Sequence, residues 1–195
     1  MTIAQREALL QIAEAAIASE RAAGVPALLT AAQTIQESGW LAHCPGCNAF
    51  GVKAHAGHER QLLRTREWFT DEEMARFLAR GDGRTAELVQ PEQRSGKRRL
   101  YAVRDWFAKY ATLAEGLADH ARLISEGARY AEAWQQYRQD GDVEDLVKGI
   151  APVYATDPGY ADQLLRIMRM PEVRAAIAEA KVAALRPQDQ AASEV

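Results

Sequence analysis

Glu37 is a candidate for an acid catalyst in this sequence. It lies at the end of an expected helix, in Gln36-Glu37-Ser38-Gly39-Trp40, where a glycine turn and an aromatic side chain follow it. A carboxyl group that protonates a glycosidic oxygen must keep its proton near neutral pH, and a partly apolar pocket raises the pKa of such a group. The negative end of a helix dipole acts in the same direction. Trp40 and Phe50 are candidates for the apolar wall. The alternative for Glu37 is a solvated carboxylate at a helix end.

The composition is that of an ordinary globular protein. The chain has 195 residues, of which 48% are hydrophobic and 26% are charged, which is enough for a core within one domain. Its net charge of −3 lacks the basic footprint of a protein that binds duplex nucleic acid. The same charge is compatible with a neutral polysaccharide as the substrate.

The sequence shows no recognisable targeting or membrane segment. No stretch reaches the ~20 apolar residues of a membrane span. The start, Met1 to Leu10, lacks the basic residues, apolar centre and cleavage site of a secretory signal. We therefore expect synthesis in the cytoplasm without a signal peptide, followed by retention there or release by another route.

The cysteines of this chain lie close together, in His43-Cys44-Pro45-Gly46-Cys47. The plainest interpretation is a small loop disulfide or a pair of free thiols. A zinc site is the alternative, because His43, His55 and His58 are near enough in sequence to join two thiolates. A thioredoxin-type redox pair needs a strand before it and a helix after it, whereas this pair follows a helix.

Apolar residues recur at helical spacing over both ends of the chain. Leu9, Ile12 and Ala16 follow this spacing in the first expected helix, and Gly24 ends it. Pro26 suits the first turn of the second helix. The expected helices cover about residues 3–23, 26–38, 112–125, 130–138, 143–150, 157–170 and 171–185.

The middle of the chain has a different pattern. Gly39 to Gly57 is loop-like, and Arg60 to Phe69 alternates as a strand does. Thr70-Asp71-Glu72-Glu73 is a capping box, which predicts a short helix over about residues 71–80. Further strands are expected over about residues 85–90 and 99–103, with Trp106, Phe107 and Tyr110 joining this region to the next helix.

These elements predict a mainly α protein of the α+β class. A helical body would carry a small β-lobe, at about residues 58–104, that holds an inserted short helix. We expect one domain over residues 1–186 and a disordered tail over residues 187–195. A cleft between the lobe and the body would be a natural site for a polymer.

Several short segments follow one another in an informative order. They are Ala32–Trp40 (AQTIQESGW), Asn48–Lys53 (NAFGVK), Thr65–Trp68 (TREW), Phe107–His120 (FAKYATLAEGLADH), Arg129-Tyr130 and Tyr154–Tyr160 (YATDPGY). Together they resemble the bacterial glucosaminidases of glycoside hydrolase family 73, to which flagellar peptidoglycan hydrolases, autolysins and some phage endolysins belong. The resemblance extends from about Pro26 to Met170.

The resemblance implies a lysozyme-like fold and an activity on bacterial peptidoglycan. Family members cleave the β-1,4 bond between N-acetylglucosamine and N-acetylmuramic acid, and Glu37 matches their general acid. The glycan strands of the wall would be the partner. We expect a monomer with no cofactor, no metal, no nucleic-acid partner and no membrane partner.

A second carboxylate is less well defined by the resemblance. Glu67, in the TREW segment, matches the assisting glutamate of several members and would activate water or stabilise a developing positive charge. The chain departs from the family pattern between about Thr70 and Arg94, and this divergent part contains Glu87 in a similar context. Glu67 is the preferred candidate, Glu87 is the alternative, and a reaction without a second acid is the third interpretation.

The resemblance also implies residues that bind substrate. Tyr154 is expected near the acid, as a catalytic residue that bonds substrate or water; its alternative is a core tyrosine. Trp40 and Phe50 either stack on a sugar or close the core, and Asn48 either binds an N-acetyl group or shapes the turn. The remaining expected binding residues are Lys53, Tyr130 and Tyr160.

Two other features have simpler interpretations. His120 is expected to be a packing or surface residue of a helix. The basic run from Arg94 to Arg99 is expected to be a solvated hairpin or a contact for anionic wall polymer.

Other functions remain as alternatives. A lytic transglycosylase also uses a single glutamate but forms an intramolecular anhydro ring instead of adding water. A non-catalytic wall-binding or structural component of a phage or flagellum belongs to another class of protein. Among hydrolases, we expect a phage endolysin that reaches the cell wall of its host after release.

Overall fold

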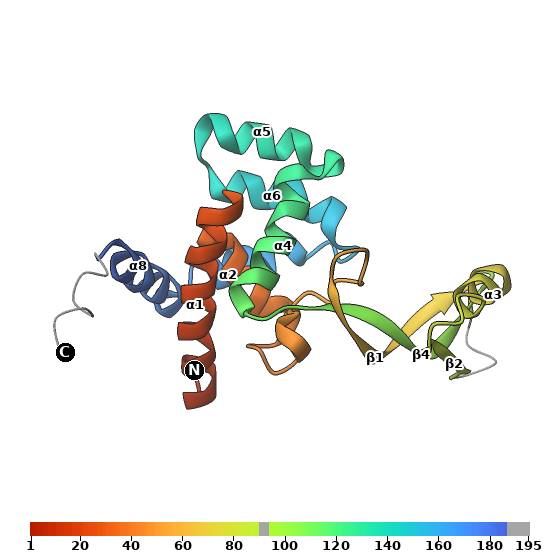
Figure 1. Ribbon diagram of the computed structural model, residues 1–195. Helices are drawn as coiled ribbons and strands as arrows, with labels where there is room; N and C mark the ends of the chain where they lie inside the picture. The colour runs from red at the N-terminus through yellow and green to blue at the C-terminus, as the bar shows by residue number, and fades with distance from the viewer. Residues whose placement is uncertain (90–93, 187–195) are drawn as a thin grey trace, which may run out of the picture. The chain divides into compact units, whose positions relative to one another are not determined.

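The computed structural model describes residues 1–89 and 94–186. The chain forms two compact units (Figure 1): a helical unit, Met1–Phe50 with Ala111–Val195, and a sheet unit, Gly51–Tyr110. This arrangement confirms the predicted mainly α class with a small β-lobe that carries a short helix. The tail predicted for residues 187–195 lies outside the described residues. Within the described part of the chain, no helix combines the length and apolarity that a membrane crossing requires.

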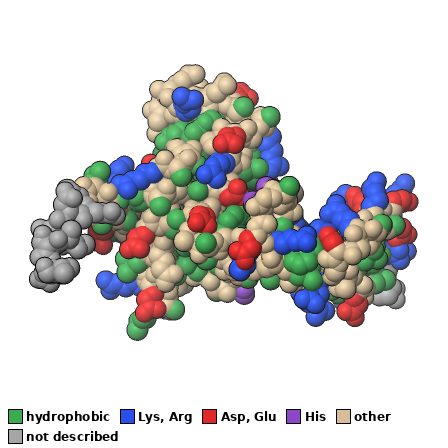
Figure 2. Space-filling view, in the orientation of Figure 1, with side chains coloured by type: hydrophobic (Ala, Val, Ile, Leu, Met, Phe, Trp, Pro, Cys, Tyr) green, Lys and Arg blue, Asp and Glu red, His purple; other side chains and the backbone are tan. Residues whose placement is uncertain are grey.

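The helical unit is built from both ends of the chain. In Figure 1 α1, in red, lies beside α4, in green. Figure 2 shows acidic and basic side chains interspersed over the visible face of this unit. Its elements are α1 (Ile3–Ala23), α2 (Ala27–Ser38), the 3-10 turn η1 (Pro45–Cys47), α4 (Leu113–Glu126), η2 (Ala128–Tyr130), α5 (Ala131–Asp140), α6 (Val143–Tyr154), α7 (Tyr160–Met168) and α8 (Pro171–Leu185).

Local capping explains where the first helix begins and ends. The hydroxyl oxygen of Thr2 accepts a hydrogen bond from the N–H of Gln5, and the Gln5 side chain accepts from the N–H of Thr2, which is a capping box. At the other end Gly24 adopts a left-handed conformation with φ 78°, and its N–H donates to the carbonyl of Glu20. This conformation favours glycine.

Helix α2 lies between two apolar clusters. Leu29 and Ala32 face the first cluster, with Ile124, Leu146, Ile150 and Leu164 among its other members. Ala31 and Ile35 face the second cluster, with Ile12, Ala16, Leu117 and Val173 among its other members. Because α2 is buried on both sides, its direction is fixed by packing along nearly its whole length.

The sheet unit is an antiparallel sheet with one helix. The strands are β1 (Glu59–Phe69), β2 (Thr85–Leu88), β3 (Arg94–Ser95) and β4 (Arg98–Lys109), and the helix is α3 (Asp71–Leu78). The order is β1-β4-β2, and β3 also pairs with β4. The N–H of Ala54 donates to the carbonyl of Trp106 at 3.0 Å, and that of Ala108 to the carbonyl of Val52 at 2.9 Å. The two ends of this unit are therefore joined to each other.

The register assigns each side chain to one face of the sheet. On the face that α3 covers, Tyr101 and Val103 pack against Met74 and Phe77. Glu67 is directly opposite Tyr101, so it belongs to this α3 face. The other face, which we call the arginine face, carries side chains that point away from α3. They include Arg64, Arg66, Glu87 and Arg104.

Strand β4 and helix α6 extend well beyond their predicted ends. Strand β4 continues beyond Val103 to Lys109, because β1 offers it a pairing partner at every position from Glu59 onward. Trp106 and Phe107, expected to be a connection, are therefore strand residues. Helix α6 continues beyond Ile150 to Tyr154, because Pro152 lies in the last turn, where the loss of one N–H interrupts little of the helix.

A glycine of α6 permits its contact with α5. A Cβ atom added to Gly149 would lie 2.6 Å from the Cβ of Ala133.

Replacing a glycine by alanine in a helix ordinarily stabilises a protein by about 1 kcal/mol. At this position we expect Gly149→Ala to destabilise by about 1–3 kcal/mol, because neither backbone can yield freely. Urea unfolding measures the difference. Gly149→Ala with Ala133→Gly should cost less than the sum of the single changes, and a stabilised Gly149→Ala variant would contradict this packing.

Candidate functional site

The last turn of α2 exposes Glu37 while the helix before it is buried. The buried hydroxyl of Ser38 donates to the carbonyl of Thr34 at 2.6 Å and accepts from the N–H of Leu41 at 2.9 Å. Gly39, with φ 58°, ends the helix. These contacts fix the path of the chain after α2 and hold the Glu37 carboxyl group at the edge of the core.

The turn after Glu37 has an unusual backbone. Trp40 and Leu41 have φ values of 61° and 64°, in the left-handed region. For residues other than glycine this conformation costs of order 1–3 kcal/mol each. Trp40 also packs against the second apolar cluster. This contact favours the interpretation that Trp40 closes the core beneath the turn.

Tyr160 makes the direct contact with the candidate acid. It begins α7, is 4% exposed, and donates its hydroxyl proton to Oε1 of Glu37 at 2.7 Å. Burial, and then the hydrogen bond to Glu37, raise the pKa of Tyr160 above its ordinary value. The hydroxyl therefore keeps its proton and acts as a donor. From the sequence, Tyr154 was expected near the acid and Tyr160 among the binding residues, whereas in the structure Tyr160 bonds to Glu37.

Tyr154 stacks on Tyr160. The ring centroids are 5.3 Å apart and the planes are inclined by 18°. Burial raises the pKa of Tyr154, and the negative charge of Glu37 raises it further. Both tyrosines are therefore neutral hydroxyl groups over the working range of most enzymes. The structure brings these motif tyrosines and Glu37 into one cluster.

His120 extends this cluster into the core. Its Nε2 lies 2.9 Å from the hydroxyl oxygen of Tyr154, and its ring stacks on Phe50 with centroids 3.6 Å apart. Burial lowers the pKa of His120 to about 3, so that the imidazole is neutral at neutral pH. From the sequence, His120 was expected to be a packing or surface residue of a helix; it is 3% exposed and lies within hydrogen-bond distance of Tyr154. The sequence signal that could have indicated a buried polar contact was a titratable residue on the apolar side of α4, which includes Leu117 and Ile124.

The other expected binding residues of the helical unit are mostly covered. Asn48 is 4% exposed and follows η1, with its N–H bonded to the carbonyl of Pro45, which favours a role in shaping the turn. Tyr130 is 2% exposed. Phe50 has one ring face against His120.

The helical unit thus presents one accessible carboxyl group backed by neutral donors. A carboxyl group held in a fixed position can exchange a proton with a bound polymer, as general acid–base catalysis requires. Glu37 is the accessible member, and Tyr160 orients it. Tyr154 stacks on Tyr160, and His120 continues the cluster into the core.

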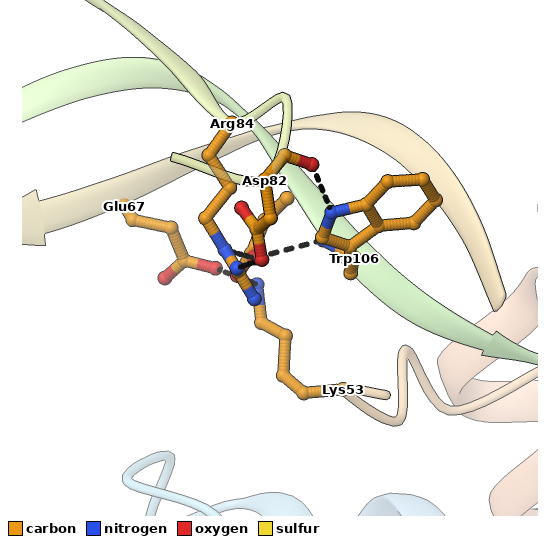
Figure 3. A network of polar contacts seen from close by, with 6 residues as sticks. Lys53, Glu67, Asp82, Arg84 and Trp106 are labelled. Atoms are coloured by element: carbon orange, nitrogen blue, oxygen red, sulfur yellow. Dashed lines mark hydrogen bonds and ion pairs between the residues drawn. The ribbon is translucent and has the colours of Figure 1, made fainter. Parts of the chain in front are cut away.

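Glu67 belongs to a network of charged side chains in the sheet unit (Figure 3). Nζ of Lys53 lies 2.9 Å from Oε1 of Glu67 and 3.0 Å from Oδ2 of Asp105. The same ammonium group lies 4.1 Å from the ring centroid of Phe107, the residue with which Lys53 forms a β-bridge. Lys53, an expected substrate-binding residue, therefore holds Glu67 in place.

Arg84 completes this network from the other side. Its side chain is 8% exposed, and its Nε donates to Oδ1 of Asp105 at 2.5 Å. Arg84 also pairs with Asp82, whose carbonyl accepts from Nε1 of Trp106 at 2.9 Å. Neither Arg84 nor Asp105 was singled out from the sequence, because their pairing depends on strand register.

Asp105 is the carboxylate that both cations share. Burial alone would raise its pKa, but hydrogen bonds from Lys53 and Arg84 outweigh burial and hold the pKa below its usual range. Asp105 therefore carries its negative charge in the folded state at neutral pH. This charge balances a buried guanidinium group, which would otherwise be costly.

Glu87, the alternative second carboxylate, lies on the arginine face. It pairs in register with Ala102, its side chain is 79% exposed, and its closest cationic partner is Arg64 at 3.7 Å. Glu67 and Glu87 therefore point to opposite faces of the same sheet. The ordered contacts with Lys53 belong to Glu67.

Cys44 and Cys47 are free thiols. Burial, and then the neighbouring Cys47, raise the pKa of Cys44 to about 11, so that its thiol stays protonated at neutral pH. Over residues 1–89 and 94–186, no group of three or more His, Cys, Asp and Glu side chains is arranged to hold a metal ion. Of the interpretations offered for Cys44 and Cys47, the structure shows a pair of free thiols.

Comparison with known proteins identifies relatives over most of the chain. A model of the glucosaminidase family, described as mannosyl-glycoprotein endo-beta-N-acetylglucosaminidase, matches residues 13–172. The peptidoglycan hydrolase FlgJ of Vibrio parahaemolyticus is 28% identical over 154 residues, which are 75% of this chain and 41% of FlgJ. The exo-glucosaminidase LytG of Bacillus subtilis is 28% identical over 116 residues, which are 55% of this chain and 40% of LytG. The chain thus spans less than half the length of either relative.

A solved structure has the same fold. The catalytic domain of the autolysin Auto from Listeria monocytogenes superposes with a TM-score of 0.62. The match covers 90% of this chain and 89% of the Auto domain at 19% identity. At this identity the likeness shows a shared fold, and it agrees with the predicted fold class.

The Asp105 network predicts how stability depends on pH. A carboxylate with a lowered folded-state pKa stabilises the protein above its unfolded-state value of about 3.9, and this contribution is lost as the pH falls through the folded-state pKa. We expect Asp105→Asn to cost about 2 kcal/mol at pH 7, because it leaves Arg84 poorly paired. The cost should shrink progressively below about pH 4.

Unfolding in urea between pH 3 and pH 7 measures this dependence. Glu87→Gln is the matched control, because it removes an exposed carboxylate from the same sheet and should change stability by less than about 0.5 kcal/mol. A cost for Asp105→Asn that does not vary with pH would show that the charge of Asp105 is not what stabilises the network.

Proposed function

Because the chain belongs to the glucosaminidase family, we propose that it hydrolyses the glycan strands of bacterial peptidoglycan. The bond proposed is the β-1,4 linkage between N-acetylglucosamine and N-acetylmuramic acid. The observation that carries this proposal is the exposed Glu37 carboxyl group, held at the end of a buried helix by the 2.7 Å hydrogen bond from Tyr160. Such a group is accessible to a polymer and fixed in direction.

The names of the relatives support the substrate class. FlgJ of Vibrio parahaemolyticus is a peptidoglycan hydrolase, and LytG of Bacillus subtilis is an exo-glucosaminidase. The chain spans 41% of FlgJ and 40% of LytG, so we assign the activities of these proteins to it only as a proposal.

In the proposed reaction Glu37 gives its proton to the oxygen of the leaving sugar, and water adds to the anomeric carbon. Tyr160 fixes the carboxyl group, and Tyr154 bonds substrate or water. We propose Glu67 as the second carboxylate, because Lys53 holds it at 2.9 Å, whereas Glu87 lies exposed on the arginine face. Its role would be to activate water or to stabilise the positive charge of the transition state.

The biological setting is a separate proposal. We propose that the enzyme acts on the bacterial cell wall as an endolysin, which is one of the roles found in the family that the sequence resembles. Adding the protein to bacteria with a permeabilised outer membrane should lower their turbidity. An enzyme that cleaves purified wall but leaves such cells intact would contradict this role and leave the hydrolase unaffected.

The first test is digestion of purified peptidoglycan by the wild type and by Glu37→Gln. We expect new reducing N-acetylglucosamine ends from the wild type and a rate about 10²–10⁴-fold lower for the variant, because proton transfer from a positioned acid contributes that much. Product masses and reducing-end analysis provide the measurement. Products that end in anhydro sugars, lighter by one water, would indicate a lytic transglycosylase. An intact wall, with correctly folded wild-type protein, would indicate a wall-binding or structural component.

The second carboxylate is tested by a matched pair of variants. Glu67→Gln should lower the rate of digestion at least ~10-fold, because the reaction loses a charge that assists it. Glu87→Gln changes the same side chain on the other face of the sheet and should leave the rate within about 2-fold of the wild type. The reverse result would assign the second carboxylate to Glu87, and two unaffected variants would mean that Glu37 acts without one.

A further inference from the structure

The buried imidazole of His120 has one polar partner and one apolar partner. Its Nε2 lies 2.9 Å from the hydroxyl oxygen of Tyr154, and its ring is stacked on Phe50 at 3.6 Å. The residue is 3% exposed. Its Nδ1 is buried and has no hydrogen-bond partner among the described residues.

This asymmetry selects one tautomer of the neutral ring. A neutral imidazole carries one N–H donor and one acceptor nitrogen. If Nδ1 carried the hydrogen, a buried N–H group would have no acceptor, and orphaned N–H groups are rarer in proteins than under-satisfied acceptors. With the hydrogen on Nε2, only a lone pair at Nδ1 is unpaired. The contact with Tyr154 is then a hydrogen bond in which His120 donates.

The direction of this bond determines what Tyr154 can do. A hydroxyl group has one proton to donate and can accept through its oxygen. When His120 donates to that oxygen, the proton of Tyr154 points away from the imidazole, on the side where the Tyr154 hydroxyl also shares a hydrogen bond with the side chain of Tyr160. Tyr154 stacks on Tyr160, the residue that bonds to Glu37, so that its hydroxyl belongs to the same cluster as the candidate acid.

We infer that His120 is a positioning residue, which donates from Nε2 to Tyr154 and so directs the hydroxyl proton of Tyr154 away from the core, toward the side of the cluster where Tyr160 bonds to Glu37. This inference rests on the proposed function. His120 touches no substrate and acts through Tyr154. Phe50 fixes the plane of the imidazole ring and thereby the direction of its Nε2–H bond.

The tautomer is measured without reference to activity. Long-range ¹H–¹⁵N correlation spectra of the wild type distinguish the two neutral tautomers, and the signals that disappear in His120→Gln identify this residue among the four histidines. We expect the Nε2–H form at pH 7. The Nδ1–H form would overturn the inference, whatever the enzyme does.

Kinetics test whether the bond acts through Tyr154. His120→Leu should lower kcat for peptidoglycan digestion about 10-fold, the size of one positioning hydrogen bond, and Tyr154→Phe should have a similar effect. His120→Gln should recover much of the loss, because its amide nitrogen donates from near the position of Nε2. In the Tyr154→Phe background, His120→Leu should cost nothing more, because its partner hydroxyl is already absent.

Two results would overturn a positioning role. One is an additive loss of about 100-fold in the double variant. The other is a normal kcat for a folded His120→Leu protein with a lowered melting temperature, which would make the residue structural. If His120→Leu does not fold, the kcat of His120→Gln and the tautomer seen in the spectra of the wild type still test the positioning role. If the wild type cleaves no wall material, the proposed function fails, and the tautomer measurement reports on the hydrogen bond independently.

Discussion

The burial of α2 between two apolar clusters is the constraint on which the helical unit depends. Leu29 and Ala31 have no exposed surface although they point to different clusters. The helix therefore cannot rotate or slide without opening a cavity on one side. The position of Glu37 follows from this packing, because the chain is fixed up to the turn before it. An acid at the end of a rigid helix needs little further support, and one hydrogen bond from Tyr160 supplies it.

In the sheet unit, charged side chains add to the apolar contacts that hold the structure. Lys53 and Arg84 share Asp105, and Lys53 also holds Glu67. The hydrophobic cluster of this unit, around Met74 and Tyr101, belongs to the same face of the sheet. A small unit buries too little apolar surface to fix every side chain. A buried arginine with two acidic partners compensates for this, since each group is costly without the others.

Local signals predicted the elements well and the network poorly. The capping box at Thr70 predicted α3, and the glycine at position 24 predicted the end of α1, because both depend on neighbouring residues alone. The length of β4 could not be predicted, because it depends on pairing with β1, which is distant in sequence. The same holds for the candidate site. The motif indicated Glu37, but the contact with Tyr160 and the burial of His120 arise only when α2, α4 and α7 pack together.

The hydrogen bonds that join Val52 to Ala108 and Ala54 to Trp106 have an evolutionary consequence. They close the sheet unit at its base, so that the chain enters and leaves it at adjacent points. An insertion with adjacent ends adds little loop-closure entropy to the protein that hosts it. Residues 51–110 can therefore lengthen or exchange strands as a cassette while the two ends of the unit stay joined. The divergence of this chain from its family pattern after Trp68 falls inside that cassette.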